Sequence, residues 1–351
     1  MFFASDNGGP VHPQVMAALN SANAGYATGY GSDPVTARAT ALVREVFEAP
    51  DAAVYFVATG TAANVLALST HARPWDTIFC TALSHINVDE CNGPEFYAGG
   101  AKLMVVGDDG AARMDARALE AALAGTGIRG VHNPQKGPVS ITQATEMGTL
   151  YSLEGIAGIA EVAHRHGVPL HLDGARFANA CGALGCSAAE MTWKAGVDLV
   201  SFGGTKNGCM GVEAVVMFDP GGAREFELRR KRGAHLFSKH RYLAAQMLGY
   251  LEGGLWLELA AMANARAARL ARGLAAADGM ELLFEVEANM VFARMPRARH
   301  QALMAAGAVY YVEDGDVAEG PGDAALTGRF VCDWSIPEAE IDRFIGIVSG
   351  G

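Results

Sequence analysis

From about residue 51 onward, the chain alternates short apolar runs with longer stretches of helical periodicity. This alternation is typical of a parallel sheet whose strands are joined by crossover helices. We therefore expect an α/β fold in which a mostly parallel sheet lies between helices. The predicted strands span residues 53–58, 77–80, 102–106, 138–143, 168–172, 198–201 and 213–218.

Helix signals and a change of character near residue 279 indicate the domain organisation. Asp33 and Pro34 supply an N-cap and a first-turn proline for one helix. The alanine-rich stretch 255–276 predicts a helix between two domains. We predict a large domain over residues 1–250 and, over residues 251–351, this linking helix with a small α+β domain. The small domain is expected to contain strands at 281–286, 290–295 and 329–334, helices at 299–306 and 337–348, and a surface loop at 313–323.

Composition narrows the functional classes. The chain has 351 residues, half of them hydrophobic, and a net charge of −11 without a basic patch, which disfavours nucleic-acid binding. No apolar run approaches the roughly 20 residues that span a bilayer, and no secretory leader is apparent, so we expect a cytoplasmic protein without a membrane partner. The six cysteines show no Cys-x-x-Cys spacing, and we expect reduced thiols and no metal site.

Three loops that follow predicted strands would open on one edge of a parallel sheet, where ligands of α/β proteins bind. In the first loop, Gly60 and Thr61 begin a helix that continues through Asn64. Backbone N–H groups at this helix start, together with the Thr61 hydroxyl, would form a cradle for a phosphate group. The same pair also occurs as a helix cap without any ligand, so the motif alone leaves both interpretations open.

The second loop begins with Asp173, directly after the apolar run 168–172. A carboxylate at a buried strand end costs desolvation unless a cation meets it, and a protonated pyridine nitrogen is such a partner. The alternative is a salt bridge between Asp173 and Arg176.

The third loop contains Lys206 among small residues. Lysine amines act as Schiff-base nucleophiles when desolvation lowers their pKa, and we expect the Gly203-Gly204 backbone to leave room for a flat ring. A phosphate-binding P-loop lysine disagrees with the pattern. A Walker loop requires Gly before the lysine and Ser or Thr after it, whereas Thr205 and Asn207 flank this one.

An anion cradle, a strand-end acid and a strand-end lysine together match the phosphate, ring nitrogen and aldehyde of pyridoxal 5′-phosphate. The chain also resembles the low-specificity L-threonine aldolases of the β-eliminating lyase group, which are fold-type I pyridoxal-phosphate enzymes. The resemblance covers nearly the whole length. It rests on Ser5-Asp6-Asn7, Tyr30-Gly31, the 60–64 loop, His85 with Asp89-Glu90-Cys91, Pro94-Glu95-Phe96, residues 142–146, 173–177 and 192–196, the Lys206 loop and Arg329.

The resemblance implies a role for each cofactor contact. Lys206 would form the Schiff base, and Asp173 would keep the pyridine nitrogen protonated. His85 matches the position that stacks on the ring, although taken alone it reads as a histidine satisfied within a loop. The implied cofactor-binding residues are Gly60, Thr61, Asn64, His85, Asp173, Arg176, Thr205, Lys206 and Lys231.

The resemblance also implies the substrate contacts and the reaction. Arg176 and Arg329 would grip the carboxylate of an amino acid, with Ser5 helping, and bidentate contacts would fix the rotation at Cα. If the Cα–Cβ bond stands perpendicular to the ring, an L-3-hydroxy amino acid such as L-threonine, L-allo-threonine or phenylserine splits to glycine and an aldehyde. The chain would then be a carbon–carbon lyase.

The base that takes the β-hydroxyl proton stays open. Better-known members have a histidine in the motif where this chain has Glu146. The candidates are therefore Glu146, His85, Glu90 or an ordered water, and we interpret His132 as a loop residue.

Members of this group are homotetramers whose active sites are shared across a dimer interface. The resemblance therefore implies that residues 1–30 contribute to the site or interface and that Tyr30 reaches a neighbour's pocket. Within the basic stretch 229–241, Lys231 is the residue expected to reach the phosphate, and most of the others read as a solvated face.

Two other classes of function remain as alternatives. Another fold-type I reaction, such as β-elimination, transamination or racemisation, would use the same cofactor contacts. A non-catalytic ligand-binding protein would keep the fold, but the presence of both Lys206 and Asp173 argues against it. A nicotinamide dehydrogenase is disfavoured because no Gly-x-Gly-x-x-Gly follows an early strand.

Overall fold

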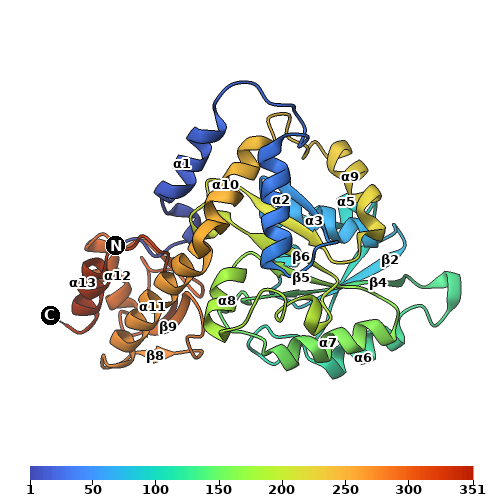
Figure 1. Cartoon of the computed structure of the whole chain (residues 1–351). Helices are drawn as coiled ribbons and strands as arrows, with labels where there is room; N and C mark the ends of the chain where they lie inside the picture. Colours follow the sequence, from blue (N-terminus) through green and yellow to red (C-terminus); the bar gives the residue numbers. More distant parts are fainter. Residues whose placement is uncertain (351) are drawn as a thin grey trace.

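A seven-stranded sheet forms the centre of the larger of two packed units in the computed structural model, which describes residues 1–350 (Figure 1). Its strand order is β1-β7-β6-β5-β4-β2-β3. All seven strands predicted from the sequence are present. They are β1 (Ala53–Val57), β2 (Asp76–Cys80), β3 (Lys102–Val105), β4 (Gln135–Thr142), β5 (Leu170–Gly174), β6 (Leu199–Gly203) and β7 (Glu213–Met217).

One strand departs from the parallel arrangement. β7 pairs antiparallel with both β6 and β1, whereas β2 to β6 pair in parallel. Residues 204–212 join β6 to β7, and this connection is too short for the crossover that two parallel strands need. The sheet is therefore mostly parallel, as predicted, and Lys206 lies in a tight connection that brings Gly203 opposite Glu213.

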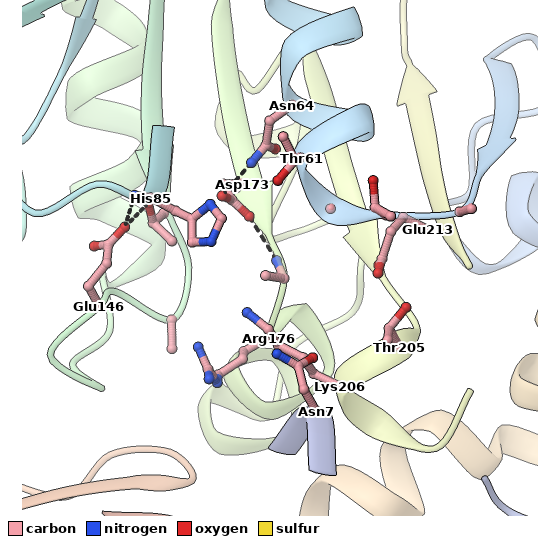
Figure 2. A pocket seen from close by; sticks show the side chains of 16 residues that line it. Asn7, Thr61, Asn64, His85, Glu146, Asp173, Arg176, Thr205, Lys206 and Glu213 are labelled. Carbon is pink, nitrogen blue, oxygen red and sulfur yellow. Dashed lines mark hydrogen bonds between the residues drawn. The ribbon is translucent and has the colours of Figure 1, made fainter. Parts of the chain in front are cut away.

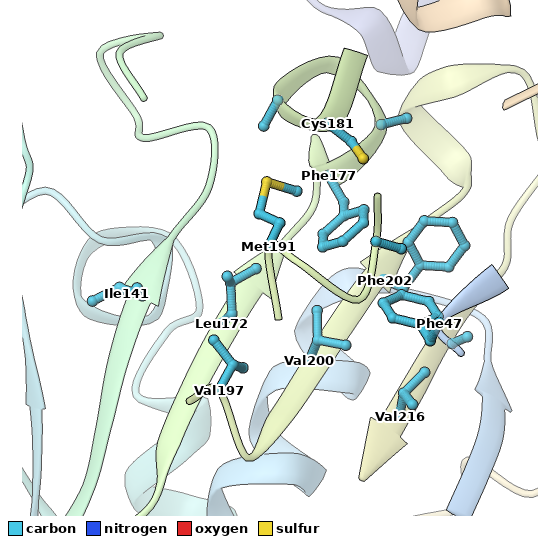
Figure 3. Packing of buried hydrophobic residues seen from close by; sticks show 14 of the residues in the cluster. Phe47, Ile141, Leu172, Phe177, Cys181, Met191, Val197, Val200, Phe202 and Val216 are labelled. Carbon is cyan, nitrogen blue, oxygen red and sulfur yellow. The ribbon is translucent and has the colours of Figure 1, made fainter. Parts of the chain in front are cut away.

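Helices cover both faces of this sheet (Figure 1). On one face Leu66 of α3 and Phe226 of α9 pack on Leu199 and Val215. On the other face a larger core joins the sheet to α2, α6, α7 and α8, and Figure 3 shows Phe47, Phe177 and Phe202 meeting there. These three rings lie 5.4 Å apart between centroids. The helices of this unit are α1 (Pro13–Ala22), α2 (Pro34–Val46), α3 (Gly60–His71), α4 (His85–Val88), α5 (Gly93–Tyr97), α6 (Ala116–Gly125), α7 (Leu153–Arg165), α8 (Phe177–Leu184), α9 (Ala223–Arg232) and α10 (Arg241–Leu251).

The long helix α11 (Leu255–Ala275) joins the two units. Its first turns, including Trp256, belong to the core of the larger unit, and its later turns, including Leu270, belong to the core of the smaller one. Phe3 also packs in the smaller core, so the start of the chain lies with its end. No helix within residues 1–350 combines the length and apolar character needed to cross a bilayer.

The smaller unit is a four-stranded antiparallel sheet, of order β10-β11-β9-β8, with helices α12 and α13. The strand predicted at residues 281–286 is too long, because only two of these residues pair with another strand. The short β10 was not predicted, since two residues give no alternating pattern. The elements are β8 (Glu281–Leu282), β9 (Met290–Pro296), α12 (Arg297–Ala305), β10 (Tyr311–Val312), β11 (Ala325–Val331) and α13 (Glu338–Val348).

The glycines before Lys206 serve close backbone packing. A Cβ atom on Gly203 would lie 2.4 Å from the carbonyl oxygen of Ala175, and one on Gly204 would lie 2.7 Å from that of Val212. The expectation that this pair leaves room for a flat ring is therefore wrong. The missing side chains instead allow the Lys206 loop to touch the β5 loop and the start of β7.

A substitution series tests this close packing. Gly203→Ala is expected to lower the free energy of unfolding by about 1–3 kcal/mol or more, because backbone atoms must move to admit the methyl group. Gly182→Ala, in helix α8, is the matched control, because among residues 1–350 no side chain and no backbone atom from outside the helix, its chain neighbours excepted, lies within 4 Å of the new Cβ. It should raise stability by about 0.5–1 kcal/mol. Urea unfolding of both variants measures the difference, and equal stabilities would contradict the packing argument.

Candidate active site

A cavity of about 290 Å³ opens at the ends of β4, β5 and β6, where the three predicted loops meet (Figure 2). Ser5, Tyr30, Lys231 and Arg329 are not among its lining residues. The residues predicted from the sequence that line it are Gly60, Thr61, Asn64, His85, Glu146, Asp173, Arg176, Thr205 and Lys206.

Lys206 reaches this cavity from a short 3₁₀ turn, Thr205–Asn207, that ends at Gly208 in the left-handed conformation. Burial lowers the pKa of the Lys206 amine, and the nearby Arg176 guanidinium lowers it further. Asp6, Asp173 and Glu213 act in the opposite direction. A lysine with a lowered pKa has a larger fraction of free amine, which is the nucleophilic form.

Asp173 lies one residue before the end of the buried strand β5 and is held by neutral donors. Its carboxylate accepts a hydrogen bond from Nδ2 of Asn64 at 2.8 Å and one from the backbone N–H of Ala175 at 3.0 Å. The alternative of a salt bridge between Asp173 and Arg176 is wrong, because Arg176 pairs with Asp6 instead. Because both donors are neutral groups, the Asp173 carboxyl group can still pair with a cation in the cavity.

The first turn of α3 presents backbone donors at the wall of the cavity. Thr59, which the sequence reading did not single out, is the N-cap, and its hydroxyl accepts the N–H of Ala62 at 3.1 Å. This contact leaves the N–H groups of Gly60 and Thr61 free at the cavity wall. Free N–H groups at a helix start attract an anion such as a phosphate.

His85 begins the short helix α4 and is bound to a buried acid. Its Nδ1 lies 2.8 Å from Oε1 of Glu90, and this hydrogen bond raises the pKa of the imidazole despite the opposing effect of burial. Glu90 also accepts from Nδ2 of Asn64 at 2.8 Å. A hydrogen-bonded chain thus runs from His85 through Glu90 and Asn64 to Asp173. These contacts with α3 and β5, and not its own loop alone, orient the His85 side chain.

Glu146 presents a second buried carboxyl to the cavity. Oε1 accepts the Thr142 hydroxyl at 2.8 Å and the backbone N–H of His85 at 3.0 Å, while the buried Oε2 has no hydrogen-bond partner within residues 1–350. Burial raises the pKa of Glu146 to about 7. A carboxyl group with this pKa exchanges a proton readily near neutral pH.

Arg176 is fixed by Asp6, whose role the sequence reading missed. Nε and Nη2 of Arg176 donate to the two carboxylate oxygens of Asp6 at 2.8 and 2.9 Å, and the side chains are only 9% and 1% exposed. Burial alone would raise the pKa of Asp6, but Arg176 and other donors hold it below its usual value. Asn289 of the smaller unit also donates to Asp6, at 3.1 Å. Asp6 therefore ties the amino terminus, the cavity and the smaller unit together.

Removing this carboxylate should cost more stability than removing an exposed one. Asp6→Ala leaves the guanidinium of Arg176 buried without its partner, which is expected to lower the free energy of unfolding by about 3–5 kcal/mol. The matched control is Glu48→Ala, which breaks the exposed 2.7 Å pair with Lys194. It should cost about 0–1 kcal/mol. Urea unfolding measures both, and similar losses would show that Asp6 is not a structural tie.

The predicted residues outside the cavity lie in two places. Arg329, on β11, donates weakly to the carbonyl of Ala4 at 3.4 Å, and its pKa is lowered by burial and by the nearby charge of Arg176. Ser5 caps the first 3₁₀ turn by accepting the N–H of Asn7, and Asn7 rather than Ser5 lines the cavity.

Tyr30 and Lys231 form a pair on the surface. Tyr30 is 54% exposed in the left-handed conformation, and Nζ of Lys231 lies 4.9 Å from its ring centroid. This pair does not reach the chain's own cavity, and its predicted role in a neighbour's site stays a prediction.

Several lining residues carried too weak a sequence signal to be assigned to the cavity. Asn7 and Thr142 lie in motifs quoted for the resemblance, but nothing in a single polar residue shows that it faces a cavity. Glu213 begins a predicted strand, where an acid reads as an edge residue. Only the pairing of β7 with β6 places Glu213 beside Gly203 and in the wall of the cavity.

The cavity suits pyridoxal 5′-phosphate. The cradle of α3 offers donors to a phosphate, Asp173 offers a carboxylate to a ring nitrogen, and Lys206 offers an amine to an aldehyde. Two buried oxygens at the site, Oδ1 of Asn64 and Oε2 of Glu146, also lack partners within residues 1–350. Such unpaired atoms at a site fit a bound polar group that would pair with them.

The fold is that of the fold-type I pyridoxal-phosphate class. Serine palmitoyltransferase of Sphingomonas wittichii, 19% identical, has the same fold, with a TM-score of 0.70 over 100% of this chain and 86% of that one. The threonine aldolase structure of Leishmania major is more similar, with 28% identity and a TM-score of 0.91 over 99% of this chain and 98% of that chain.

The chain belongs to the β-eliminating lyase family, whose sequence profile matches residues 3–297. The low specificity L-threonine aldolase of a Pseudomonas species is 41% identical over 339 residues, which are 97% of this chain and 94% of that protein. The enzyme of the same name from Pseudomonas aeruginosa is 40% identical over 341 residues, with the same shares covered. The family predicted from the sequence is therefore confirmed.

Proposed function

We propose that this protein cleaves L-3-hydroxy amino acids, L-threonine and L-allo-threonine first among them, between Cα and Cβ to give glycine and an aldehyde. The observation that carries the proposal is the placement of Lys206 and Asp173 in one cavity with a buried carboxyl, that of Glu146. The 41% identity to a protein named as a low specificity L-threonine aldolase supports the same reaction.

In this proposal, pyridoxal 5′-phosphate supplies an electron sink for the bond that breaks at Cα. Lys206 would hold its aldehyde, and Asp173 would pair with its ring nitrogen. Gly60, Thr61 and Thr205 would hold its phosphate. These residues would fix the cofactor against which the substrate is oriented.

The arginines orient the substrate. Arg176 is held rigid by Asp6, and its free Nη1 is available to a carboxylate. Burial is the main cause of the lowered pKa of Arg329. The positive charge of the nearby Arg176 guanidinium repels that of Arg329 and lowers the pKa further. An anion between them would relieve this repulsion, so the substrate carboxylate is proposed to bind there.

Glu146 is proposed to accept the β-hydroxyl proton. Its Oε1 is held in place by Thr142 and by the backbone of His85, and Oε2 has no hydrogen-bond partner among residues 1–350. His85 and Glu90 are hydrogen-bonded to each other. We therefore assign to His85 the packing against the cofactor ring and the orientation of the substrate hydroxyl, and not the role of base. Proton removal and cleavage of Cα–Cβ together make a retro-aldol step.

Product analysis tests the proposal. The purified protein with cofactor is incubated with L-threonine, L-allo-threonine or phenylserine, and glycine and aldehyde are quantified. Equal amounts of glycine and aldehyde are expected. Formation of 2-oxobutyrate or the D-amino acid without glycine would favour β-elimination or racemisation. The absence of both products and of a visible absorption band would favour the non-catalytic ligand-binding alternative.

We infer that the active protein is a cytoplasmic homotetramer with sites shared between subunits. The exposed pair of Tyr30 and Lys231 supports this arrangement, because an aromatic ring under an ammonium group on the surface holds a cation ready for an anionic partner. Analytical ultracentrifugation tests the assembly, and a monomer with full activity would contradict it.

A further inference from the structure

Glu213 is a buried acid in the cavity wall that the proposed reaction does not use. It begins β7, where it lies opposite Gly203 of β6 and Val57 of β1, and it is 6% exposed. Figure 2 shows its side chain between the turn at the start of α3 and Thr205. It therefore borders the region to which the phosphate is assigned.

Glu213 contacts the Lys206 loop and also lines the cavity. Oε2 accepts the backbone N–H of Gly204 at 2.9 Å, and the Thr205 hydroxyl forms a hydrogen bond with the same carboxyl group. The free N–H groups of Gly60 and Thr61 line the same cavity. A charged carboxylate beside a phosphate would repel it strongly, because few water molecules screen the two charges there. The arrangement is favourable only if a proton lies between the two groups.

We propose that Glu213 holds a proton and donates a hydrogen bond to the phosphate of the cofactor, so that cofactor binding above neutral pH takes up one proton from solvent. This inference rests on the proposed function in one respect: both assume that the ligand is a pyridoxal-type phosphate. The step moves one proton from solvent to a carboxylate oxygen and breaks no other bond.

The surroundings of Glu213 agree with this. Burial raises its pKa to about 7, although Thr205, Gly204 and Lys206 favour the ionised form. At pH 6 the carboxyl is therefore already protonated, and at pH 8 most molecules must take up a proton before the phosphate binds. This uptake weakens binding by about tenfold at pH 8, one unit above the pKa. The titratable groups that face Glu213 are Lys206 in the loop, Asp173 on β5, Cys209 before β7 and Tyr250 on α10.

The neighbouring groups do not supply the same titration. Burial raises the pKa values of Cys209 and Tyr250 well above their usual range, so both stay neutral between pH 6 and 8. Lys206 does titrate at a lowered pKa. Titration of Lys206 affects binding in both the wild type and a Glu213 variant. A comparison of the two proteins therefore isolates the effect of Glu213.

The test measures binding of pyridoxine 5′-phosphate to the full chain freed of cofactor. This probe carries the phosphate but no aldehyde, so it forms no Schiff base with Lys206. Affinity is measured by calorimetry at pH 6 and pH 8 for the wild type and for Glu213→Gln, whose amide donates a hydrogen bond at every pH. From pH 6 to pH 8, the affinity of the wild type should fall by about tenfold more than the affinity of the variant. Pyridoxine without phosphate is the control ligand and should show no such difference.

A second readout does not depend on the variant's affinity. Calorimetry at pH 8 in two buffers of different ionisation enthalpy gives the number of protons taken up, which should be larger by about one for the wild type than for Glu213→Gln. An affinity ratio that stays constant with pH, or equal proton uptake by both proteins, overturns the inference about Glu213 alone. Failure of both proteins to bind the probe overturns the cofactor assignment as well.

Discussion

Replacing Lys206 with alanine is expected to lower glycine formation from L-threonine by at least about 10³-fold. In the proposed reaction the amine is the nucleophile for the cofactor aldehyde, and among residues 1–350 no second lysine lines the cavity. Borohydride treatment of the wild type should fix a pyridoxyl group on the peptide that contains Lys206, as measured by mass spectrometry. The variant should carry none.

Lys194→Ala is the matched control for this experiment. Lys194 lies on the surface, where it pairs with Glu48 at 2.7 Å, and its loss should leave activity and labelling unchanged. A pyridoxyl group found on another lysine of the wild type would contradict the assignment of Lys206. So would a Lys206→Ala variant that keeps its activity.

Glu146→Gln is expected to lower kcat by about 10²–10⁴-fold, the usual contribution of a general base. The amide keeps the shape of the side chain and its contacts with Thr142 and His85, but it cannot accept the hydroxyl proton. Cofactor absorption should therefore stay normal while turnover falls. Glu154→Gln, an exposed acid in the first turn of α7, should change neither quantity.

The pH profile separates Glu146 from the other candidate bases. Burial raises the pKa of Glu146 to about 7, and only its deprotonated form accepts a proton. With cofactor saturating, kcat/KM of the wild type should rise about tenfold per pH unit below 7 and level off above it. Glu146→Gln should lack this rise. An unchanged profile in the variant would move the role to His85, Glu90 or a water molecule.

The seven central strands and the three site loops could be predicted from the sequence because their signals are local. Apolar runs such as 168–172 mark buried strands, and the residue that follows a parallel strand lies at the ligand-binding edge. The resemblance then assigned Lys206, Asp173 and His85 to one cofactor, and the structure brings them into one cavity.

Contacts between distant segments could not be predicted in the same way. The partner of Arg176 is Asp6, 170 residues away in the sequence, and not the nearby Asp173. Glu213 reaches the cavity only because the short connection 204–212 turns β7 antiparallel to β6. Neither position stands out in the chain, since a charged residue shows no local sign of the partner that will bury it.

The amino-acid sequence was sufficient to predict the alternation of strands and helices, the family, and the residue types that a pyridoxal-phosphate site requires. Those properties depend on side-chain periodicity and on motifs a few residues long. The tertiary structure alone decided which acids face the cavity, which arginine is neutralised and which carboxyls have a pKa near 7. These depend on burial and on the distance between charges, and both are set when segments far apart in the chain pack together.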